Sequence, residues 1–545
     1  MPIHFYYVAL TLIFALLGYY STAFLSFVFY WAFASFFIIS IAYLIKKPSI
    51  FRKNSDGRIP YYINILLWPF ISGVYLYNAI ARRLDKTAKM HQIDQGLFVA
   101  TRLNTQDFTS TEIANIDAIV DMTAEFSALD WGASALDLDY LSVPTLDHQT
   151  PNIDEVREAI TWINNHINQG HNVVVHCALG RGRSVFVAAA YLLAKYPELT
   201  VRSALEKITK VRTQAGLNKA QLKILLKYRE NNELNIYPTA WLIANPVAGG
   251  GKWPANKQNV VNQLYKHFNL VIKETTLALS AKSFAQKAIS ENVNTVIAAG
   301  GDGTLREVAE ELINTQISFG ILPMGTANAF AHNLYGHLSK ISPVELAVSH
   351  LCNKKTTQID TATCNDKTVL LLTGIGLEYD MINYADRDVK DDMGQFAYLN
   401  GFRKAYTNGE IHKLNVSFDD EPFEIIDTAS FVIANAAPVT SILAQGNGIP
   451  DCQDGYLDVT WIKPTHFMSD KLMGVGELIS SSLNKDPGSN DRSVNENNIQ
   501  TKRIKKVNIN SEETIHYVID GELFTSKSLE MSINPDALTV FLKQE

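Results

Sequence analysis

A cysteine and an arginine close together in the sequence carry the strongest chemical signal of this chain. Cys177 follows a run of valines that predicts a buried strand, and the Ala- and Leu-rich stretch after Ser184 predicts a helix. Gly180 and Gly182 favour a tight turn between the two. The N–H groups of such a loop and of the following helix converge on one point, where they lower the pKa of a thiol and attract a phosphate group. Arg183 can then bind two phosphate oxygens while the Cys177 thiolate attacks phosphorus.

The sequence from Cys177 through five intervening residues to Arg183 and Ser184 resembles the signature of the protein-tyrosine-phosphatase superfamily. Residues 92–230 as a whole resemble its dual-specificity branch. The resemblance implies that Cys177 is the nucleophile, that Arg183 binds the phosphate group, and that Ser184 helps the thiolate to leave. Further matches are residues 96–98, 119–125 and 140–147.

The resemblance also implies a general acid. In that family an aspartate some way before the cysteine protonates the leaving oxygen and later acts as a base. Asp147 stands thirty residues before Cys177 and follows Val143-Pro144, a context that favours it for this role. Asp137 and Asp139 are the alternatives.

The substrate of this phosphatase stays open at the level of sequence. The predicted loop holds Ala178, Leu179 and Arg181 and no acidic residue, so the floor of the pocket is expected to be basic to apolar. Such a floor resembles that of the lipid-phosphate and phosphoinositide members of the family as much as that of the protein-directed members. His176, beside the nucleophile, is expected to be a structural histidine rather than a base.

Three further loops in the second half of the chain each follow a predicted strand. Glycines let the backbone approach phosphate groups, and a helix N-terminus favours their charge. Loops at the carboxyl ends of neighbouring strands would line one crevice, which is where open α/β sheets bind nucleotides. None of the three is a Walker A sequence or a G-x-G-x-x-G fingerprint. The loops are residues 245–252, 300–304 and 322–328.

Together the three loops resemble the catalytic domain of the diacylglycerol kinase family, which includes sphingosine kinases and bacterial lipid kinases. The resemblance covers residues 239–545 and includes the distal Asp520-Gly521-Glu522. It implies that ATP, with Mg²⁺, phosphorylates a lipid hydroxyl such as that of diacylglycerol or a sphingoid base. Ala329 stands where many diacylglycerol kinases carry Asp, so the acceptor lipid stays open.

The same resemblance assigns roles to residues of this chain. Asp302 helps to position the metal and the phosphates, and Glu522, in one motif with Asp520, takes the proton from the lipid hydroxyl. Asp451, Asp454 and the backbone of Tyr456 resemble a structural magnesium site. The residues implied to hold ATP are Asn245, Gly249, Thr275, Gly300, Gly301, Asp302, Gly303, Thr304 and Thr326.

These loops require an α/β framework. From His91 onward, β-branched runs alternate with helical patterns, which predicts a multidomain α/β protein with parallel strands. We expect a parallel-sheet phosphatase domain and a two-lobed kinase with an α/β nucleotide lobe and a β-rich lobe. The expected segments are a transmembrane hairpin at 1–45, a basic linker at 46–90, the phosphatase at 91–233 and the kinase at 239–545, with lobes at about 239–360 and 361–545.

The amino-terminal segment has the composition of a membrane anchor. Residues 3–20 and 23–45 contain no Lys, Arg, Asp or Glu, and a bilayer core of about 30 Å is spanned by about 20 apolar residues in a helix. The basic cluster at 46–58 is expected to stay in the cytoplasm. The chain is therefore predicted to be a multi-pass protein, of a bacterial inner membrane, with both catalytic domains in the cytoplasm.

A third apolar stretch, residues 59–81, contains Pro60, Pro69 and Gly73. Basic residues on both of its flanks favour an interfacial or re-entrant segment over a third span. A true span would place the residues from 82 onward on the other side of the membrane.

Composition limits the remaining possibilities. The chain has 545 residues, of which 47% are apolar and 19% charged, which is typical of several globular domains. Residues 1–90 hold nine basic and two acidic residues, a net charge of +7. Because the whole chain has a net charge of −7, residues 91–545 carry −14, which argues against a nucleic-acid partner. Four cysteines without ligand spacing predict a reducing compartment and no structural zinc.

The function predicted from these observations is a bifunctional, membrane-anchored phosphatase and lipid kinase whose partners are membrane lipids. Tethering raises the effective concentration of such substrates at both sites. Two alternatives remain at this level. The phosphatase domain can be a protein Ser/Thr/Tyr phosphatase with a signalling role, or a phosphate-binding sensor without turnover.

Overall fold

The protein folds into two compact units. The first consists of residues 1–238 with 265–269, and the second of residues 239–264 with 270–545. The computed structural model describes residues 3–85, 87–104, 107, 115–128, 138–384, 410–437, 444, 450–463 and 499–542.

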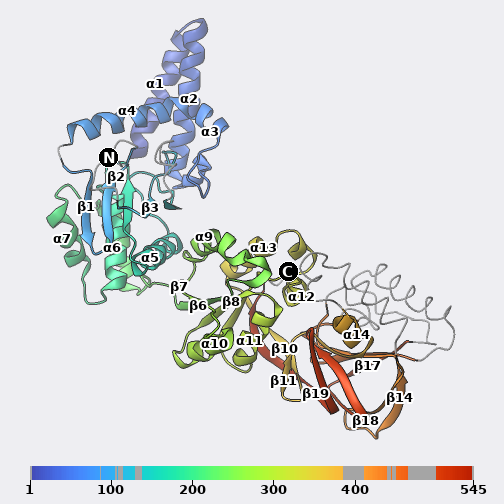
Figure 1. Ribbon diagram of the computed structural model, residues 1–545. Coiled ribbons are helices and arrows are strands. Elements are labelled where there is room, and N and C mark those ends of the chain that lie inside the picture. The colour runs from blue at the N-terminus through green and yellow to red at the C-terminus, as the bar shows by residue number, and fades with distance from the viewer. Residues whose placement is uncertain are drawn as a thin grey trace. The chain divides into compact units, whose positions relative to one another are not determined.

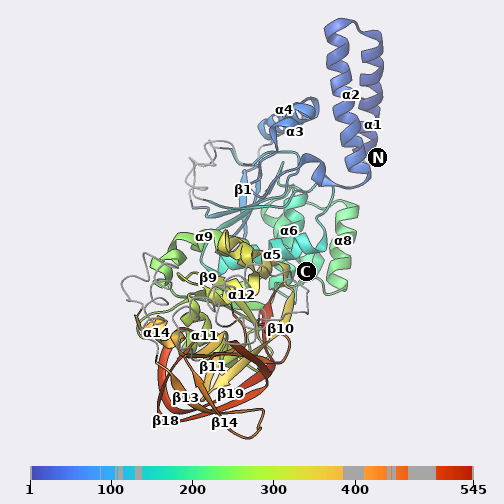
Figure 2. The same cartoon turned by 90° about the vertical axis from the view of Figure 1, so that its right-hand side faces the viewer.

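Two apolar helices open the first unit. Helices α1 (Ile3–Tyr20) and α2 (Ala23–Leu44) lie side by side as a hairpin (Figure 2). Both are long and apolar enough to cross a membrane, and only 11% and 22% of their apolar windows are buried inside the protein. Their apolar side chains therefore point mostly outward, unlike those of a helix in a soluble core.

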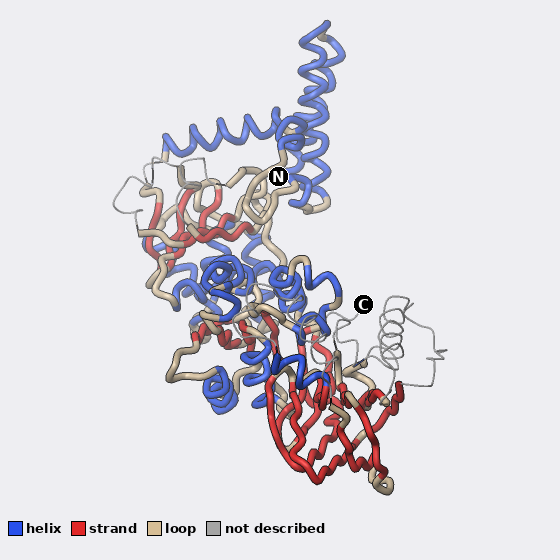
Figure 3. Tube along the Cα trace, turned by 45° about the vertical axis from the view of Figure 1, so that its right-hand side comes forward, coloured by secondary structure: helices blue, strands red, loops and turns tan. Residues whose placement is uncertain are grey.

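The third apolar stretch forms two short helices instead of one long one. The 3₁₀ turn η1 (Pro48–Phe51) leads to α3 (Tyr61–Leu66) and α4 (Trp68–Leu84). Pro69 stands in the first turn of α4, where its missing N–H costs nothing but where it prevents α3 from continuing. In Figures 1 and 3, α4 runs across the direction of the α1–α2 hairpin.

A five-stranded sheet forms the centre of the rest of this unit, with strand order β1-β2-β5-β3-β4. Strands β2, β5, β3 and β4 are parallel, which brings their carboxyl ends to one edge. The elements are β1 (Met90–Asp94), β2 (Leu97–Thr101), β3 (Ala118–Asp121), β4 (Asp139–Ser142), α5 (Ile153–Asn168), β5 (Val173–Cys177), α6 (Arg183–Lys195), α7 (Val201–Val211) and α8 (Lys219–Glu230).

The prediction of parallel strands is wrong for β1, which pairs with β2 in the antiparallel direction. The two strands are joined by a tight turn at Gly96, whose φ of 71° lies in the left-handed region. So short a connection cannot return the chain for a parallel pairing, which needs a crossover.

Helix α6 is buried along almost its whole length, from Arg183 to Leu193. It packs on the sheet and is surrounded by α5, α7 and α8. Because a helix enclosed in this way cannot shift without disturbing the core, the loop that precedes it is held in a fixed place.

The second unit is built on one continuous sheet. Its path runs β17-β16-β15-β12-β18-β19-β9-β8-β6-β7, and β10, β11, β13 and β14 are attached beside it. Strands β6, β8 and β9 are parallel and almost fully buried, as expected for a sheet covered by helices on both faces. Most of the remaining pairings are antiparallel.

The predicted nucleotide and β-rich lobes share this sheet. The last strand, β19, lies parallel to β9 with Val540 opposite Phe319, so the carboxyl-terminal end of the chain joins the nucleotide lobe. The β-rich part, at the lower right of Figure 1, surrounds a core of aliphatic and aromatic side chains that includes Phe418, Phe431 and Trp461.

The elements of the nucleotide-lobe part are β6 (Thr239–Ala244), η3 (Ala248–Gly250), α9 (Lys252–Leu264), β7 (Asn269–Glu274), α10 (Ala281–Ser290), β8 (Thr295–Gly300), α11 (Asp302–Leu312), β9 (Ser318–Pro323), α12 (Ala329–Tyr335), η4 (His337–Lys340) and α13 (Pro343–Asn353). Those of the β-rich part are β10 (Thr356–Cys364), β11 (Lys367–Val369), β12 (Leu372–Gly376), α14 (Leu377–Tyr384), β13 (His412–Phe418), β14 (Glu424–Thr428), β15 (Ser430–Ala434), β16 (Leu457–Ile462), β17 (Ile499–Ile504), β18 (Lys506–Ile519) and β19 (Glu522–Phe541).

Candidate active sites

Cys177 lies at the carboxyl end of β5, where the chain turns through residues 178–182 into α6. Its Sγ is 3.4 Å from the Ser184 hydroxyl. The first turn of α6 has Gly182 as its N-cap and no side chain that caps it, so its N–H groups remain available to an anion. The strand, loop and helix predicted from the sequence are all present, and they bring Cys177 and Ser184 together.

Three residues remote in the sequence hold this loop from outside. Arg212 donates from Nε to the carbonyl of Gly180 (2.7 Å) and from Nη2 to that of Leu179 (3.1 Å). Asn78, on α4, donates to the carbonyl of Ala178 (2.9 Å). The backbone N–H of Arg102 donates to the same carbonyl (3.3 Å). With its carbonyls bound from behind, the loop is left with its N–H groups for the ligand.

Gly180 is required by this arrangement. Its φ is 66°, and a Cβ atom there would come within 2.5 Å of the Ala100 carbonyl oxygen and 2.7 Å of Arg212 Nη2. Any other residue would therefore displace either β2 or the arginine that holds the loop.

Arg183 is 1% exposed and is held by a carboxylate that the sequence analysis did not single out. Its two terminal nitrogens form a fork with Glu125, at 2.9 and 2.7 Å, and Nη1 also donates to the carbonyl of Thr145 (2.8 Å). Its Nε is buried and has no hydrogen-bond partner in the described part of the chain. An orphaned, charged N–H next to a nucleophile fits a phosphate oxygen.

The electrostatics of this site favour a thiolate. Burial alone would raise the pKa of Cys177, but the charge of Arg183 and hydrogen bonds from the Ser184 hydroxyl and from the Ser184 and Arg181 N–H groups lower it below its usual range. The opposite holds for Cys364 and Cys452, because burial raises the pKa of each to about 12.

This difference predicts selective alkylation. A lowered pKa keeps Cys177 ionised at pH values where an ordinary thiol, with a pKa of about 8.5, is protonated. Iodoacetamide at pH 7 is therefore expected to label Cys177 faster than a free cysteine, to leave Cys364 and Cys452 unlabelled, and to be slowed by inorganic phosphate. Peptide mapping by mass spectrometry measures the rates. A Cys177 rate that follows the pH dependence of free cysteine would contradict the prediction.

Asp147 is near the phosphate-binding side chain. Its Oδ1 lies 3.3 Å from Arg183 Nη2, and its side chain is 46% exposed. Its N–H donates to the hydroxyl of Tyr43 at the end of α2 (3.3 Å). The carboxylate is thus half-open to solvent at the mouth of the site, as a group that exchanges protons with a leaving oxygen and with water must be.

The alternative Asp139 lies at the wrong end of its strand. Asp139 is the first residue of β4 and pairs with Ala118, the first residue of β3. Ala118 in turn pairs with Val173, the first residue of β5, whereas Cys177 is the last residue of β5. Asp139 and Cys177 therefore lie at opposite ends of the sheet. The Asp139 carboxylate lies 3.7 Å from His166 instead. Asp137, the other alternative, is outside the described residues.

His176 is structural, as expected. It is 1% exposed and lies 3.8 Å from Asp121. Burial lowers its pKa to about 4, against the opposing effect of Asp121, so the imidazole is neutral. Asp121 also accepts hydrogen bonds from the buried Lys53 (2.7 Å) and from Tyr140 (2.7 Å). The lysine thus ties the linker after α2 to the end of β3.

In the second unit the three predicted loops meet. Asn245 donates to the Thr304 hydroxyl (3.2 Å), and Lys252 Nζ donates to the carbonyl of Gly325 (2.7 Å). A Cβ on Gly325 would lie 2.5 Å from the Cα of Gly301, so these two loops touch through their backbones. Glycine is needed at position 325 because a side chain there would collide with the backbone of Gly301.

Gly249 and the start of α11 complete a cradle of main-chain atoms. Gly249 has a φ of 56°, and a Cβ there would collide with the carbonyl of Met324. Helix α11 has Gly301 as N-cap and no capping side chain, so its first N–H groups are free for an anion. Thr275 is placed at this edge by its N–H, which donates to the carbonyl of Ala244 (2.8 Å). The residues present therefore fit the phosphates of a nucleotide.

Asp302 has a structural bond that the sequence did not predict. Its two carboxylate oxygens accept the N–H groups of Ala329 and Phe330, each at 3.1 Å. It thereby holds the third loop against the second. Asn328, in the left-handed region at φ 51°, closes the third loop by bonding both the N–H and the carbonyl of Gly325.

The distal Asp520-Gly521-Glu522 motif forms the turn between β18 and β19. Asp520 accepts the N–H groups of Leu370, Leu371 and Leu372 at 2.8 to 3.0 Å, and burial raises its pKa to about 6. Glu522 is half-exposed and forms an ion pair with Arg306 of α11. Asp520 therefore holds the turn, and the carboxylate of Glu522 lies beside it at the start of β19, paired with Arg306.

The residues predicted to bind a structural magnesium ion do not fit one in this structure. The carboxylate of Asp454 forms an ion pair with Arg503, whose guanidinium also lies over the ring of Tyr456. Asp451 Oδ1 accepts the N–H of Gln453 (3.0 Å). A guanidinium already neutralises the carboxylate that would bind the cation, so no step is assigned to a metal here.

The two sites define a phosphatase domain and a kinase domain in one chain, and the sequence families agree. Residues 97–231 match the dual specificity phosphatase catalytic domain, and residues 239–364 match the diacylglycerol kinase catalytic domain. The chain therefore contains a dual-specificity phosphatase-like and a lipid kinase-like catalytic domain. Both resemblances stated above are confirmed.

Several known proteins are similar to this chain. The chain is 30% identical over 365 residues to "Uncharacterized protein sll0036" of Synechocystis sp., an alignment that covers 65% of this chain and 80% of that protein. It is 25% identical over 303 residues to a "Probable lipid kinase YegS-like" of Alcanivorax borkumensis, covering 53% and 94%. A crystal structure of a diacylglycerol kinase from Bacillus anthracis aligns with 56% of this chain and 97% of its own, with 20% identity and a TM-score of 0.43.

Proposed function

We propose that the protein is a membrane-anchored bifunctional enzyme that removes phosphate from a lipid headgroup and, with ATP and Mg²⁺, phosphorylates the hydroxyl of a different lipid. One observation carries the lipid assignment of the phosphatase. The apolar hairpin and a helix that follows it both contact the phosphatase site, because Tyr43 of α2 accepts the N–H of Asp147 and Asn78 of α4 donates to the carbonyl of Ala178.

Helix α4 has two faces that support this placement. One face buries Phe70, Ile71 and Asn78 in the first unit. The other exposes Leu76, Tyr77, Ile80 and Leu84, whose exposed fractions are 50% to 76%. Large apolar side chains that are open to water on a helix next to two candidate spans suit the interface of a bilayer. The phosphatase loop would then lie close to the lipid headgroups.

Asn78 is a positioning residue in this proposal. Replacing it with alanine leaves the carbonyl of Ala178 with one donor fewer, and we expect the kcat for a soluble phosphomonoester to fall about fivefold, the effect of one lost hydrogen bond. The matched control is Asn64→Ala, which removes a similar bond from α3 to the carbonyl of Ile59. An equal loss in both variants would show a general packing defect instead.

The proposed phosphatase reaction uses groups already in place. The Cys177 thiolate forms a bond to phosphorus while the bond from phosphorus to the lipid oxygen breaks, and Asp147 gives its proton to that oxygen. Water then attacks the phosphocysteine and returns a proton to Asp147. The thiolate leaves with a hydrogen bond from Ser184, and inorganic phosphate is released.

The proposed kinase reaction depends on positioning. The loops around Gly249, Gly301 and Gly325 would hold the phosphates of ATP, which supplies the transferable phosphoryl group when bound. Glu522 would accept the proton of the lipid hydroxyl. If both domains acted on one identical lipid the chain would only hydrolyse ATP, so we propose different substrates or reciprocal control.

Phosphate release by the purified full chain in vesicles, without ATP, tests the lipid assignment. The panel contains lipid phosphates and a phosphotyrosine peptide. Release from lipids alone is expected. Turnover of the peptide but of no lipid would favour the protein phosphatase, and no turnover at all would make the domain a phosphate sensor. Transfer of phosphate from labelled ATP to a panel of lipid alcohols tests the kinase in the same preparation.

A further inference from the structure

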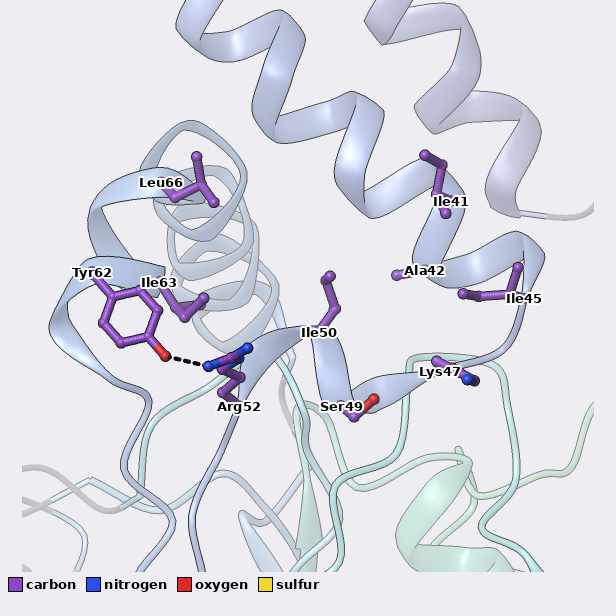
Figure 4. A pocket seen from close by; sticks show the side chains of 10 residues that line it. All are labelled: Ile41, Ala42, Ile45, Lys47, Ser49, Ile50, Arg52, Tyr62, Ile63 and Leu66. Atoms are coloured by element: carbon purple, nitrogen blue, oxygen red, sulfur yellow. Dashed lines mark hydrogen bonds between the residues drawn. The ribbon is translucent and has the colours of Figure 1, made fainter.

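A cavity of about 510 Å³ lies between the last turn of α2, the turn η1 and α3 (Figure 4). One side of it is apolar and is lined by Ile41, Ile45 and Leu66. These three side chains are 40% to 53% exposed, so the cavity opens beside the outward-facing apolar surface of the hairpin.

The other side of the cavity carries two cations. Arg52 donates from Nη1 to the hydroxyl of Tyr62 (2.9 Å), as the dashed line in Figure 4 shows. Its left-handed conformation, with φ at 46°, ends η1 and turns the chain beside α3. Lys47 lines the same cavity.

These two cations line the cavity and, unlike Lys53 and Arg82, have no carboxylate partner among the described residues. Lys53 pairs with Asp121, and Arg82 pairs with Asp107. In the described part of the chain, neither Lys47 nor Arg52 forms an ion pair. Figure 4 shows the two cations at opposite ends of η1, Arg52 beside Tyr62 and Lys47 beside Ile45. Two uncompensated positive charges at the edge of an apolar cavity attract an anion that also has an apolar part.

We propose that this cavity binds one anionic phospholipid, with its phosphate on Lys47 and Arg52 and its acyl chains along Ile41, Ile45 and Leu66. The inference rests on the membrane anchoring proposed above and assigns a lipid site separate from Cys177. The apolar wall favours a lipid over free phosphate, because burying these side chains against acyl chains removes apolar surface from water.

The position of the cavity connects it to the phosphatase. Phe51 of η1 is fully buried in a cluster with Tyr43, Ala124 and Leu146. Lys53, two residues further on, reaches Asp121 at the end of β3. A lipid bound to Arg52 therefore holds the segment that attaches the hairpin to the catalytic unit.

Native mass spectrometry of the full chain in a neutral detergent tests this site. Dioleoyl phosphatidylglycerol, at concentrations where the adduct saturates, is expected to give one retained lipid per chain, and dioleoyl phosphatidylcholine none. The double variant Lys47→Gln/Arg52→Gln is expected to weaken the binding about tenfold or more, because two charge-assisted contacts are lost. The control Lys46→Gln/Arg58→Gln removes the same charge at exposed positions outside the cavity.

The possible results distinguish this lipid site from three different modes of binding. An equal loss in both double variants would show diffuse attraction to a basic surface and overturn the inference. Displacement of the lipid by inorganic phosphate at concentrations near its own would show an anion site without lipid selectivity and also overturn it. Binding that is lost in Arg183→Met but kept in Lys47→Gln/Arg52→Gln would place the lipid in the catalytic pocket, which overturns the inference but leaves the proposed function intact.

Discussion

Replacing Cys177 with serine is expected to reduce phosphate release by at least about a thousandfold, because the covalent step then lacks its nucleophile. A serine hydroxyl keeps the size of the side chain, but Arg183 and the loop N–H groups do not ionise it at neutral pH. The measurement is the initial rate of phosphate release by the full chain under identical conditions.

Two controls belong to this experiment. The kinase rate of Cys177→Ser is expected to stay unchanged, which shows that the chain is folded. Cys352→Ser, on helix α13 of the second unit, is expected to leave phosphate release unchanged. A Cys177→Ser variant that keeps its phosphatase rate would rule out the phosphocysteine intermediate.

Replacing Glu522 with glutamine is expected to lower the kinase rate by about 100- to 10,000-fold, the range for loss of a general base. Glutamine keeps the shape of the side chain but cannot take a proton from the lipid hydroxyl. The measurement is the initial rate of transfer of labelled phosphate from ATP to the accepted lipid at one fixed pH.

The ion pair between Glu522 and Arg306 requires a separate control. Arg306→Gln removes the pair but leaves the carboxylate, so the kinase rate is expected to change far less than in Glu522→Gln. An equal loss in the two variants would mean that the ion pair matters and that Glu522 is not the base. Phosphate release by the first unit is expected to be unaffected in both.

The chemistry of each site could be predicted from sequence because its main parts are local. Cys177, Gly180, Gly182 and Arg183 lie within one strand, loop and helix, and the preferences of a few neighbouring residues determine such a segment. The loop at 300–304 was predictable for the same reason. The apolar hairpin was predictable from composition, since its outward-facing side chains need no partner within the protein.

The partners of these residues could not be predicted, because they are remote in the chain. Glu125 is 58 residues from Arg183, Arg212 is 32 residues from Gly180, and Asn78 is 100 residues from Ala178. A lone glutamate, arginine or asparagine has many possible partners in the chain. Only the packing of distant elements, such as that of α6 on β2 and β5, selects one.

The sequence by itself determined the two catalytic motifs, the nucleotide-type loops and the apolar hairpin, since each depends on residues close together in the chain. The tertiary structure alone placed Asp139 at the end of the sheet remote from Cys177, which agrees with the preference for Asp147 as the proposed general acid. It also brought Arg503 to Asp454 and Asn78 to the catalytic loop. The physical reason is that backbone preferences act over a few residues, whereas the position of a charge or a hydrogen-bond donor in a site is set by the packing of whole strands and helices.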